Sequence, residues 1–192
     1  MAEPTILDAI EDSNLFGRWF RRPETWQRWF VFFAALFGLE MTDEEAAIFR
    51  HHTGRTFPPA MPAREAWLVV GRRGGKSFAM AVVAVFLACF RQYRRYLQPG
   101  EKATIFVIAA DRDQAKSIMN YIDGLLTNIP ILRGHLLNQK EGEFELTGSV
   151  VIEVGTASFR SVRGRTFAAI LADEIAFWRD ESSANPDVEI LA

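Results

Sequence analysis

Hydrophobic residues in the first part of the chain recur at three- and four-residue spacings, which is the pattern of amphipathic helices. Between Phe16 and Phe37 many of these positions are aromatic. Pro23 suits the first turn of a helix that starts near Glu24, because the amide hydrogen that proline lacks has no partner there. Aromatic side chains at helical spacing are more typical of a core than of a base-stacking surface, so we expect a helical core.

A further short helix is expected after Thr42. Thr42 and Glu45 have the spacing of a capping box, in which each residue bonds the backbone of the other, and the helix should run through Phe49. Residues 53–62 are rich in proline and glycine and should form a loop. The sequence therefore predicts an N-terminal helical segment over residues 1–60.

From residue 61 the pattern changes to continuous apolar runs that alternate with helical stretches. Strands are predicted at residues 67–70, 104–109 and 167–172, and a β-hairpin at residues 144–146 and 150–154 around a turn at 147–149. Helices are predicted from residue 77 to about 96 and from about 112 to 126. Apolar strands separated by helices are typical of an α/β fold with a mainly parallel sheet covered on both faces, and the strand at 167–172 should be buried.

Two apolar runs, at residues 29–37 and 78–90, could suggest membrane segments. Both are shorter than the ~20 residues that a helix needs to cross a bilayer, and the N-terminus lacks the basic and apolar regions of a signal peptide. We interpret both as buried helices and expect no membrane partner.

The net charge and the cysteine content exclude some classes of function. A formal net charge of −2 argues against a general nucleic-acid coat, so any DNA contact should come from local patches. Cys89 is the only cysteine in the chain, which excludes a disulfide framework and a cysteine-rich metal site. A cytoplasmic chain fits these features best.

A glycine-rich loop stands between the first predicted strand and the helix that follows it. Its residues are Gly71, Arg72, Arg73, Gly74, Gly75, Lys76 and Ser77. Such a loop can turn its N–H groups toward phosphate oxygens, with Lys76 reaching the β- and γ-phosphates and Ser77 binding Mg²⁺. The usual motif has its first glycine where Val70 stands, and an ordinary glycine turn before a helix is the alternative. Two adjacent arginines repel each other unless a polyanion is present, which favours a triphosphate.

Two adjacent carboxylates, Asp173 and Glu174, follow the last predicted strand directly. The carboxyl ends of parallel strands are where open α/β sheets bind ligands. Asp173 could hold Mg²⁺ through water, and Glu174 could orient and deprotonate an attacking water. A solvated acidic pair at the start of a helix is the alternative, and the phosphate loop favours the functional interpretation.

Together these segments resemble the ATPase region of the large terminase subunit, which packages DNA into phage heads. The resemblance rests on the phosphate loop, with an arginine four residues before Lys76, on residues 111–115, and on residues 161–164 shortly before the acidic pair. Residues 23–27 are similar to an adenine-binding segment of that family. The likeness covers the chain from about Phe16 to Trp178 and implies a P-loop NTPase fold.

The resemblance also implies roles for single residues. Arg72 would sense the γ-phosphate, Asp173 would be the metal residue and Glu174 the catalytic base. Gln27 would read the adenine edge, with Trp26 nearby. Arg163, with Arg160 or Arg165 as a further candidate beside it, would act across a subunit boundary as an arginine finger.

The family normally continues past the acidic pair into a further strand with a coupling motif and then into a nuclease domain. Here only residues 175–192 remain, so we expect an ATPase core at residues 61–192 that is incomplete at its C-terminus, with no nuclease activity. ATP and Mg²⁺ are the implied cofactors. Double-stranded DNA, a portal protein, a small terminase subunit and further copies in a ring are the implied partners, in the host cytoplasm and transiently at the procapsid portal. A helicase-like P-loop ATPase and a truncated nucleotide-binding remnant without turnover remain alternatives.

Overall fold

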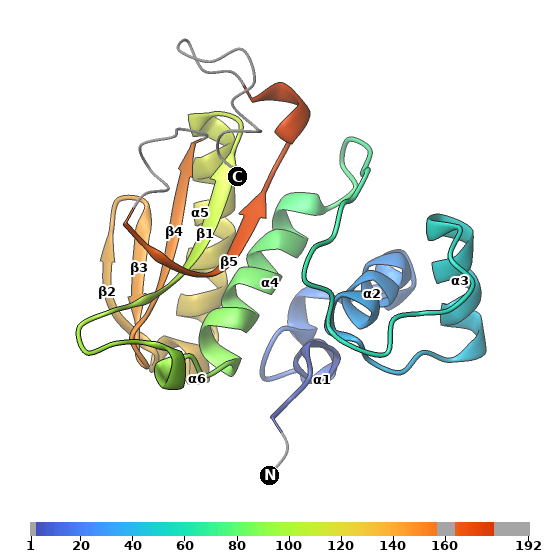
Figure 1. Ribbon diagram of the computed structural model, residues 1–192, viewed down its shortest axis with the longest axis horizontal. Helices are drawn as coiled ribbons and strands as arrows, with labels where there is room; N and C mark the ends of the chain where they lie inside the picture. Colours follow the sequence, from blue (N-terminus) through green and yellow to red (C-terminus); the bar gives the residue numbers. More distant parts are fainter. Residues whose placement is uncertain (1–2, 157–163, 179–192) are drawn as a thin grey trace. The chain divides into compact units, whose positions relative to one another are not determined.

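A computed structural model describes residues 3–156 and 164–178 of the chain (Figure 1). Its internal contacts divide the molecule into two compact units, Met1–Gly74 and Gly75–Ala192. This division falls inside the predicted phosphate loop. The boundary that we expect at residue 60 from composition stays a prediction.

The first unit is helical, as its periodicity predicts. Its elements are α1 (Ile6–Glu11), η1 (Gly17–Trp19), α2 (Pro23–Phe37) and α3 (Asp43–Thr53). α2 packs against both α1 and α3. The capping box that opens α3 is confirmed, since the Thr42 hydroxyl accepts from the Glu45 amide and the Glu45 carboxylate accepts from the Thr42 amide.

α2 has clear signals at both of its ends. Pro23 is its first residue, as predicted, and Gly38 ends it in the left-handed conformation with a φ of 63°. The chain then returns to this end, where the amide of Ala63 donates to the carbonyl of Leu36. A Cβ atom at position 38 would lie 2.3 Å from the carbonyl carbon of Met61, so both the conformation and the close approach require glycine.

The prediction of a strand at residues 67–70 is wrong. These residues form no regular secondary structure, and Trp67 and Val69 are strongly exposed, at 69% and 106%. A short apolar run becomes a strand only where a neighbouring strand bonds its backbone. Residues 67–70 belong to the first unit and take no place in the sheet, which lies in the second.

The second unit is a mixed α/β structure built on a five-stranded sheet (Figure 1). Its strands are β1 (Ala103–Ala109), β2 (Leu136–Lys140), β3 (Glu143–Leu146), β4 (Val150–Thr156) and β5 (Thr166–Ala172), in the spatial order β2-β3-β4-β1-β5. β1 pairs in parallel with β4 and β5, and β3 pairs antiparallel with both β2 and β4. Four strands therefore run in one direction and only β3 opposes them, which agrees with the predicted mainly parallel sheet.

β1 lies between β4 and β5 in the sheet, and every residue of the strand is buried. The helices α4 (Lys76–Phe90) and α5 (Arg112–Asn128) pack against each other and against β1 and β4, so they cover one face of the sheet. On the other face Phe106 and Ile108 form a cluster with Trp178, which follows η4 (Ile175–Phe177). The apolar run of residues 78–90 is thus a buried helix, as its composition predicts.

β5 is confirmed as a strand, but the prediction that it is buried is wrong. It stands at one edge of the sheet, and none of its residues is fully buried. Its exposed Ile170, at 38%, shows why the sequence misleads here. An apolar run indicates strand propensity but does not report how many neighbours the strand has.

The helix predicted from residue 77 to 96 is shorter than expected, because α4 ends at Phe90. Side chains that follow it satisfy the last carbonyls: Arg91 donates to the carbonyl of Phe90 and the Tyr93 hydroxyl donates to that of Leu87. These bonds replace a further helical turn. A separate 3₁₀ turn, η2, spans Arg94–Tyr96.

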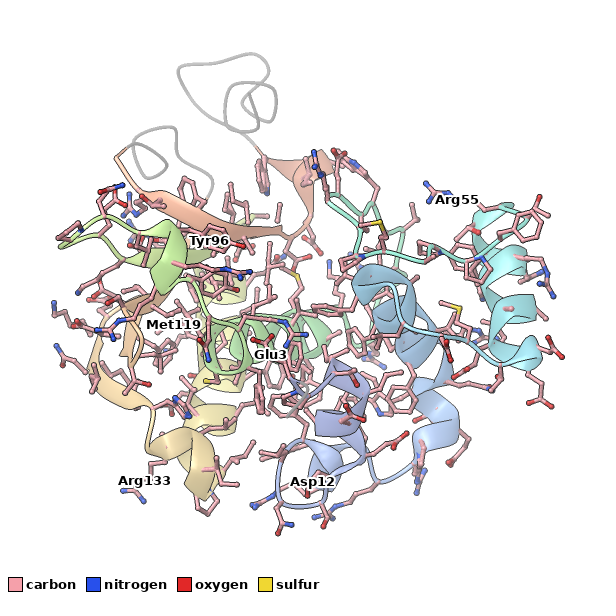
Figure 2. The ribbon with its side chains drawn as sticks, turned by 60° about the horizontal axis from the view of Figure 1, so that its bottom comes forward. Glu3, Asp12, Arg55, Tyr96, Met119 and Arg133 are labelled. Carbon is pink, nitrogen blue, oxygen red and sulfur yellow. The ribbon has the colours of Figure 1, made fainter. Side chains whose placement is uncertain are left out.

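The hairpin around residues 147–149 is confirmed, with Leu146 opposite Val150 across the turn. β2 was not predicted from the sequence, because its two leucines are followed by three polar residues without an alternating pattern. The short helix α6 (Pro130–Arg133) is missed as well, and Arg133 extends from its end in Figure 2. Among the described residues there is no helix whose length and apolar character would allow it to span a bilayer.

Candidate functional site

The predicted phosphate loop passes from one unit into the other. In the first unit, Gly74 closes a turn by donating from its amide to the carbonyl of Gly71. A Cβ atom at Gly74 would lie 2.5 Å from the Cγ1 atom of Val70, so the tight turn needs glycine at this position. Arg72 and Arg73, between Gly71 and Gly74, are exposed, and Arg73 has a positive φ of 60°.

In the second unit, Gly75 precedes α4 in the left-handed conformation, with a φ of 82°, and Lys76 is the first helical residue. The amide of Ala79 bonds the carbonyl of Gly75, which starts the helical ladder. Ser77 lies in the first turn and is half-buried. Amides in this turn have no carbonyl partner within the helix, which makes a helix N-terminus favourable for anions.

The acidic pair is held where β5 leaves the sheet. The Asp173 amide donates to the carbonyl of Ile108 on β1, over 2.8 Å, and the Trp178 indole donates to the carbonyl of Asp173, also over 2.8 Å. Asp173 is 4% exposed. Two backbone contacts therefore fix this carboxylate at the carboxyl ends of adjacent parallel strands.

Lys76 meets both carboxylates of the acidic pair. Its Nζ atom lies 3.2 Å from Oδ1 of Asp173 and contacts Oε1 of Glu174 in a hydrogen-bonded ion pair. The Lys76 and Glu174 side chains are 29% and 27% exposed, whereas that of Asp173 is 5% exposed. The structure thus brings three of the predicted site residues into one cluster.

Burial of the ammonium by itself lowers the pKa of Lys76, but hydrogen bonds and charge interactions with Glu174 and Asp173 outweigh it, so the net shift is upward. Lys76 therefore stays charged at neutral pH. The second oxygen of Asp173, Oδ2, is buried and has no hydrogen-bond partner in the described part of the chain. An orphaned carboxylate oxygen is an acceptor that a cation or its water ligands would satisfy.

Glu174 adopts a backbone conformation that is uncommon for a residue with a side chain. Its φ of 52° and ψ of 42° lie in the left-handed region, which costs about 1 kcal/mol relative to ordinary helical or extended backbone. Asp173 continues from the strand, while this turn directs the next side chain differently. Both carboxylates nevertheless contact Lys76.

Gln114, which lies in the family-like segment of residues 111–115, is part of the same cluster. Its Nε2 atom donates to Oε2 of Glu174 over 2.7 Å. Gln114 lies in the first turn of α5, just beyond the end of β1. The signal that could have identified it is topological, because the carboxyl ends of neighbouring parallel strands meet at one edge.

The arginine finger stays a prediction. Arg163 and Arg160 lie outside the described residues. Arg165 is described, and its Nε atom pairs with Glu153 at 2.7 Å while its guanidinium stacks over Phe106. Arg165 is therefore engaged within its own unit.

The residues expected at the adenine lie on α2, in the first unit. Gln27 is exposed and lines a groove of about 380 Å³ between α2 and α3, whereas Trp26 packs edge-on against Phe20. Trp29, one helical turn on from Trp26, donates from its indole nitrogen to the carbonyl of Gly74 over 2.8 Å. No sequence pattern predicts this bond, which ties α2 to the predicted phosphate loop.

No group of three or more histidine, cysteine or acidic side chains that could hold a metal ion is present in residues 3–156 and 164–178. A metal at the cluster would need hydroxyl, water or ligand oxygens besides Asp173. This is the type of site that Mg²⁺ occupies beside phosphate groups.

Comparison with known proteins adds one match. The family model described as "Terminase large subunit, T4likevirus-type, N-terminal" matches residues 67–185, which is more than half of the 192 residues and includes Lys76, Gln114 and the acidic pair. A search of curated proteins finds no match. The family indicates a role in DNA packaging, with DNA and the packaging machinery as partners. The chain belongs to the N-terminal family of T4-like terminase large subunits.

Proposed function

We propose that this chain is the ATP-binding and ATP-hydrolysing part of a DNA-packaging motor with a P-loop NTPase fold. The observation that carries the proposal is the cluster of Lys76, Asp173 and Glu174. A lysine at a helix N-terminus, after a glycine-rich turn, faces two carboxylates at the end of a parallel strand. This combination of charges suits a nucleoside triphosphate with a divalent cation.

Lys76 is the phosphate-binding residue of the proposal. Its ammonium is held charged by the carboxylates, and it can exchange them for the β- and γ-phosphate oxygens of ATP. The amides of the first turn of α4 add donors directed toward an anion. Arg72 would contact the γ-phosphate, as the family resemblance implies.

Ser77 and Asp173 would hold Mg²⁺, since one offers a hydroxyl oxygen and the other a buried carboxylate oxygen without a partner. When bound, Mg²⁺ neutralises charge on the phosphate oxygens. Asp173 is suited to this role because its backbone is fixed on both sides by hydrogen bonds. Fixed ligands lower the cost of arranging the site.

Glu174 would act as the general base. It takes a proton from a water molecule as the water oxygen bonds the γ-phosphorus, and the bond from that phosphorus to the β–γ bridging oxygen breaks. ADP leaves with the electron pair of that bond, and the proton passes from Glu174 to phosphate or solvent. The half-exposed carboxylate of Glu174 suits this role, because it must reach water.

Gln27 and Trp26 are proposed at the adenine, and Arg163 as an arginine finger supplied to a neighbouring copy. These roles rest on the family resemblance. Repeated hydrolysis in a ring of copies on a portal would drive double-stranded DNA into the procapsid.

The test is phosphate release from ATP by the full chain with Mg²⁺, compared with a Glu174→Gln variant. A matched control is Glu145→Gln, because Glu145 also pairs with a lysine, Lys102, at 2.7 Å, but lies on β3 away from the acidic pair. We expect Glu174→Gln to lower kcat by about a hundredfold or more while ATP still binds. Glu145→Gln should leave kcat unchanged.

Two other results would replace the proposal. Equal rates for the wild-type and Glu174→Gln chains would remove Glu174 from the mechanism. Tight ATP binding without phosphate release by the wild type, where a longer version of the protein hydrolyses ATP, would indicate a nucleotide-binding element without turnover.

A further inference from the structure

The Glu174 carboxylate is held by two different kinds of donor. Lys76 contacts Oε1, and the Gln114 side-chain amide donates to Oε2 over 2.7 Å. A carboxylate only accepts hydrogen bonds, so the amide must turn its Nε2 atom toward Glu174. The acceptor oxygen of Glu174 therefore sets the orientation of the Gln114 amide, and the amide in turn orients that oxygen.

The backbone of Gln114 is also held in place. Its amide donates to Oδ1 of Asp111 over 2.8 Å, in the N-terminal cap of α5. β1 leads into this cap, and β1 pairs directly with β5, which leads to Glu174. The two side chains thus extend from adjacent, hydrogen-bonded parts of the sheet, and neither depends on a long surface loop.

We propose that Gln114 is a positioning residue that holds the Glu174 carboxylate in the orientation from which it takes the proton of the attacking water. This inference rests on the proposed ATPase function. It assigns to Gln114 a role that acts through Glu174 and does not require contact with ATP.

A neutral amide suits this role better than a cation would. A second ammonium or guanidinium at Oε2 would hold the proton-accepting oxygens more strongly and make Glu174 a weaker base. The neutral amide fixes the orientation of the Glu174 carboxylate and adds no positive charge beside it.

The Gln114 carbonyl oxygen, Oε1, is buried without a hydrogen-bond partner among the described residues. It lies on the same amide group that contacts Glu174. The carbonyl end of this amide is therefore enclosed by protein, while its Nε2 end bonds Glu174.

The experiment compares Gln114→Leu and Gln114→Glu in the full chain, with the kcat for phosphate release and the Kd for ATP measured separately. The first change removes the donor, and the second keeps the size but places a like charge beside Glu174. We expect kcat to fall on the order of tenfold to a hundredfold, with Kd changed by about twofold or less, because a misdirected base affects the chemical step. Asn128→Ala is the control, since this amide lies at the other end of α5 and bonds Gly124.

A second measurement tests the contact without hydrolysis. In the exchanged double variant Gln114→Glu with Glu174→Gln, an amide again faces a carboxylate. Its melting temperature should therefore exceed the value expected by adding the shifts of the two single variants. Additive shifts would overturn the contact, and with it the proposal.

The remaining outcomes are distinct. Wild-type turnover with an unchanged kcat in Gln114→Leu would overturn this inference alone. Loss of ATP binding and of melting temperature in parallel with kcat would show a structural role and overturn it as well. Absence of phosphate release from the wild-type chain would overturn the ATPase proposal, and the positioning role would fall with it.

Discussion

The Nζ atom of Lys76 lies 3.2 Å from Oδ1 of Asp173. Lys76 is the first residue of a helix, and Asp173 follows a strand that is far from this helix in the sequence. The contact joins the N-terminus of α4 to the carboxyl end of β5 within the second unit. A carboxylate that is only 5% exposed is stabilised by a nearby ammonium, because a buried charge without compensation is costly. In the same pair, the ammonium of Lys76 has the charge that suits a phosphate, and the carboxylate of Asp173 has the charge that suits a divalent cation.

Lys76→Met should weaken ATP binding strongly. The methionine keeps most of the side-chain volume but removes the charged donor, so the Kd should rise on the order of a hundredfold. Titration with a fluorescent ATP analogue measures this. Lys102→Met is the matched control, because Lys102 also hydrogen-bonds a glutamate and also has a raised pKa for that reason. Equal affinities in both variants would contradict a phosphate-binding role for Lys76.

Asp173→Asn should change how ATP binding depends on magnesium. The amide is close in size, keeps an oxygen near Lys76 and loses the negative charge, so the Mg²⁺ concentration for half-maximal binding should rise about tenfold or more. Binding is measured at fixed nucleotide over a range of Mg²⁺. Glu141→Gln, at an exposed turn position between β2 and β3, serves as the control for a lost charge. An unchanged magnesium dependence would exclude Asp173 as the metal residue.

Gly38→Ala and Gly54→Ala should differ in their cost to stability. Both glycines end a helix in the left-handed conformation, with φ of 63° and 69°. At Gly54 nothing lies within 4 Å of an added Cβ, whereas at Gly38 the Met61 backbone lies 2.3 Å away. We expect a loss of about 1 kcal/mol in the free energy of unfolding for Gly54→Ala and about 3 kcal/mol for Gly38→Ala. Urea unfolding tests the difference, and equal losses would show that the close approach at Gly38 relaxes.

Cys89 should be unreactive in the folded chain. Burial raises the pKa of its thiol from 9.0 to about 12, so the reactive thiolate is scarce at pH 8. Labelling by a thiol reagent should be at least about a hundredfold slower than in the urea-unfolded chain. Because Cys89 is the only cysteine, Cys89→Ala provides the blank. Rapid, complete labelling under native conditions would contradict the raised pKa of this thiol.

The same thiol affects stability at alkaline pH. Above pH 9.0 the unfolded chain releases the thiol proton, while the folded chain retains it up to about pH 12, so the folded state binds more protons in this interval. Stability should therefore fall as the pH rises through it. The fall should be smaller in Cys89→Ala, and an equal pH dependence in both chains would show that Cys89 ionises normally.

Features that depend on neighbours within a few residues could be predicted from the sequence. Pro23 starts α2, Thr42 and Glu45 cap α3, and the turn at residues 147–149 joins β3 to β4. Each of these is determined by local backbone geometry and by hydrogen bonds over three or four positions. The apolar run of residues 78–90 likewise predicts a buried helix, because a helix without a polar face must be covered.

The sequence alone also placed Lys76 and the acidic pair at element ends where ligands bind, but it could not place Gln114 beside Glu174. That contact depends on which strands are neighbours, and strand order is decided by packing of the whole sheet. The same dependence explains the two errors on strands: residues 67–70 have the composition of a strand without a partner, and β5 has a buried composition at an edge. Composition indicates which secondary structure a segment can form, whereas the tertiary structure decides which segments it contacts. Each long-range contact must overcome the entropy lost when the chain between the two contacting residues is closed into a loop.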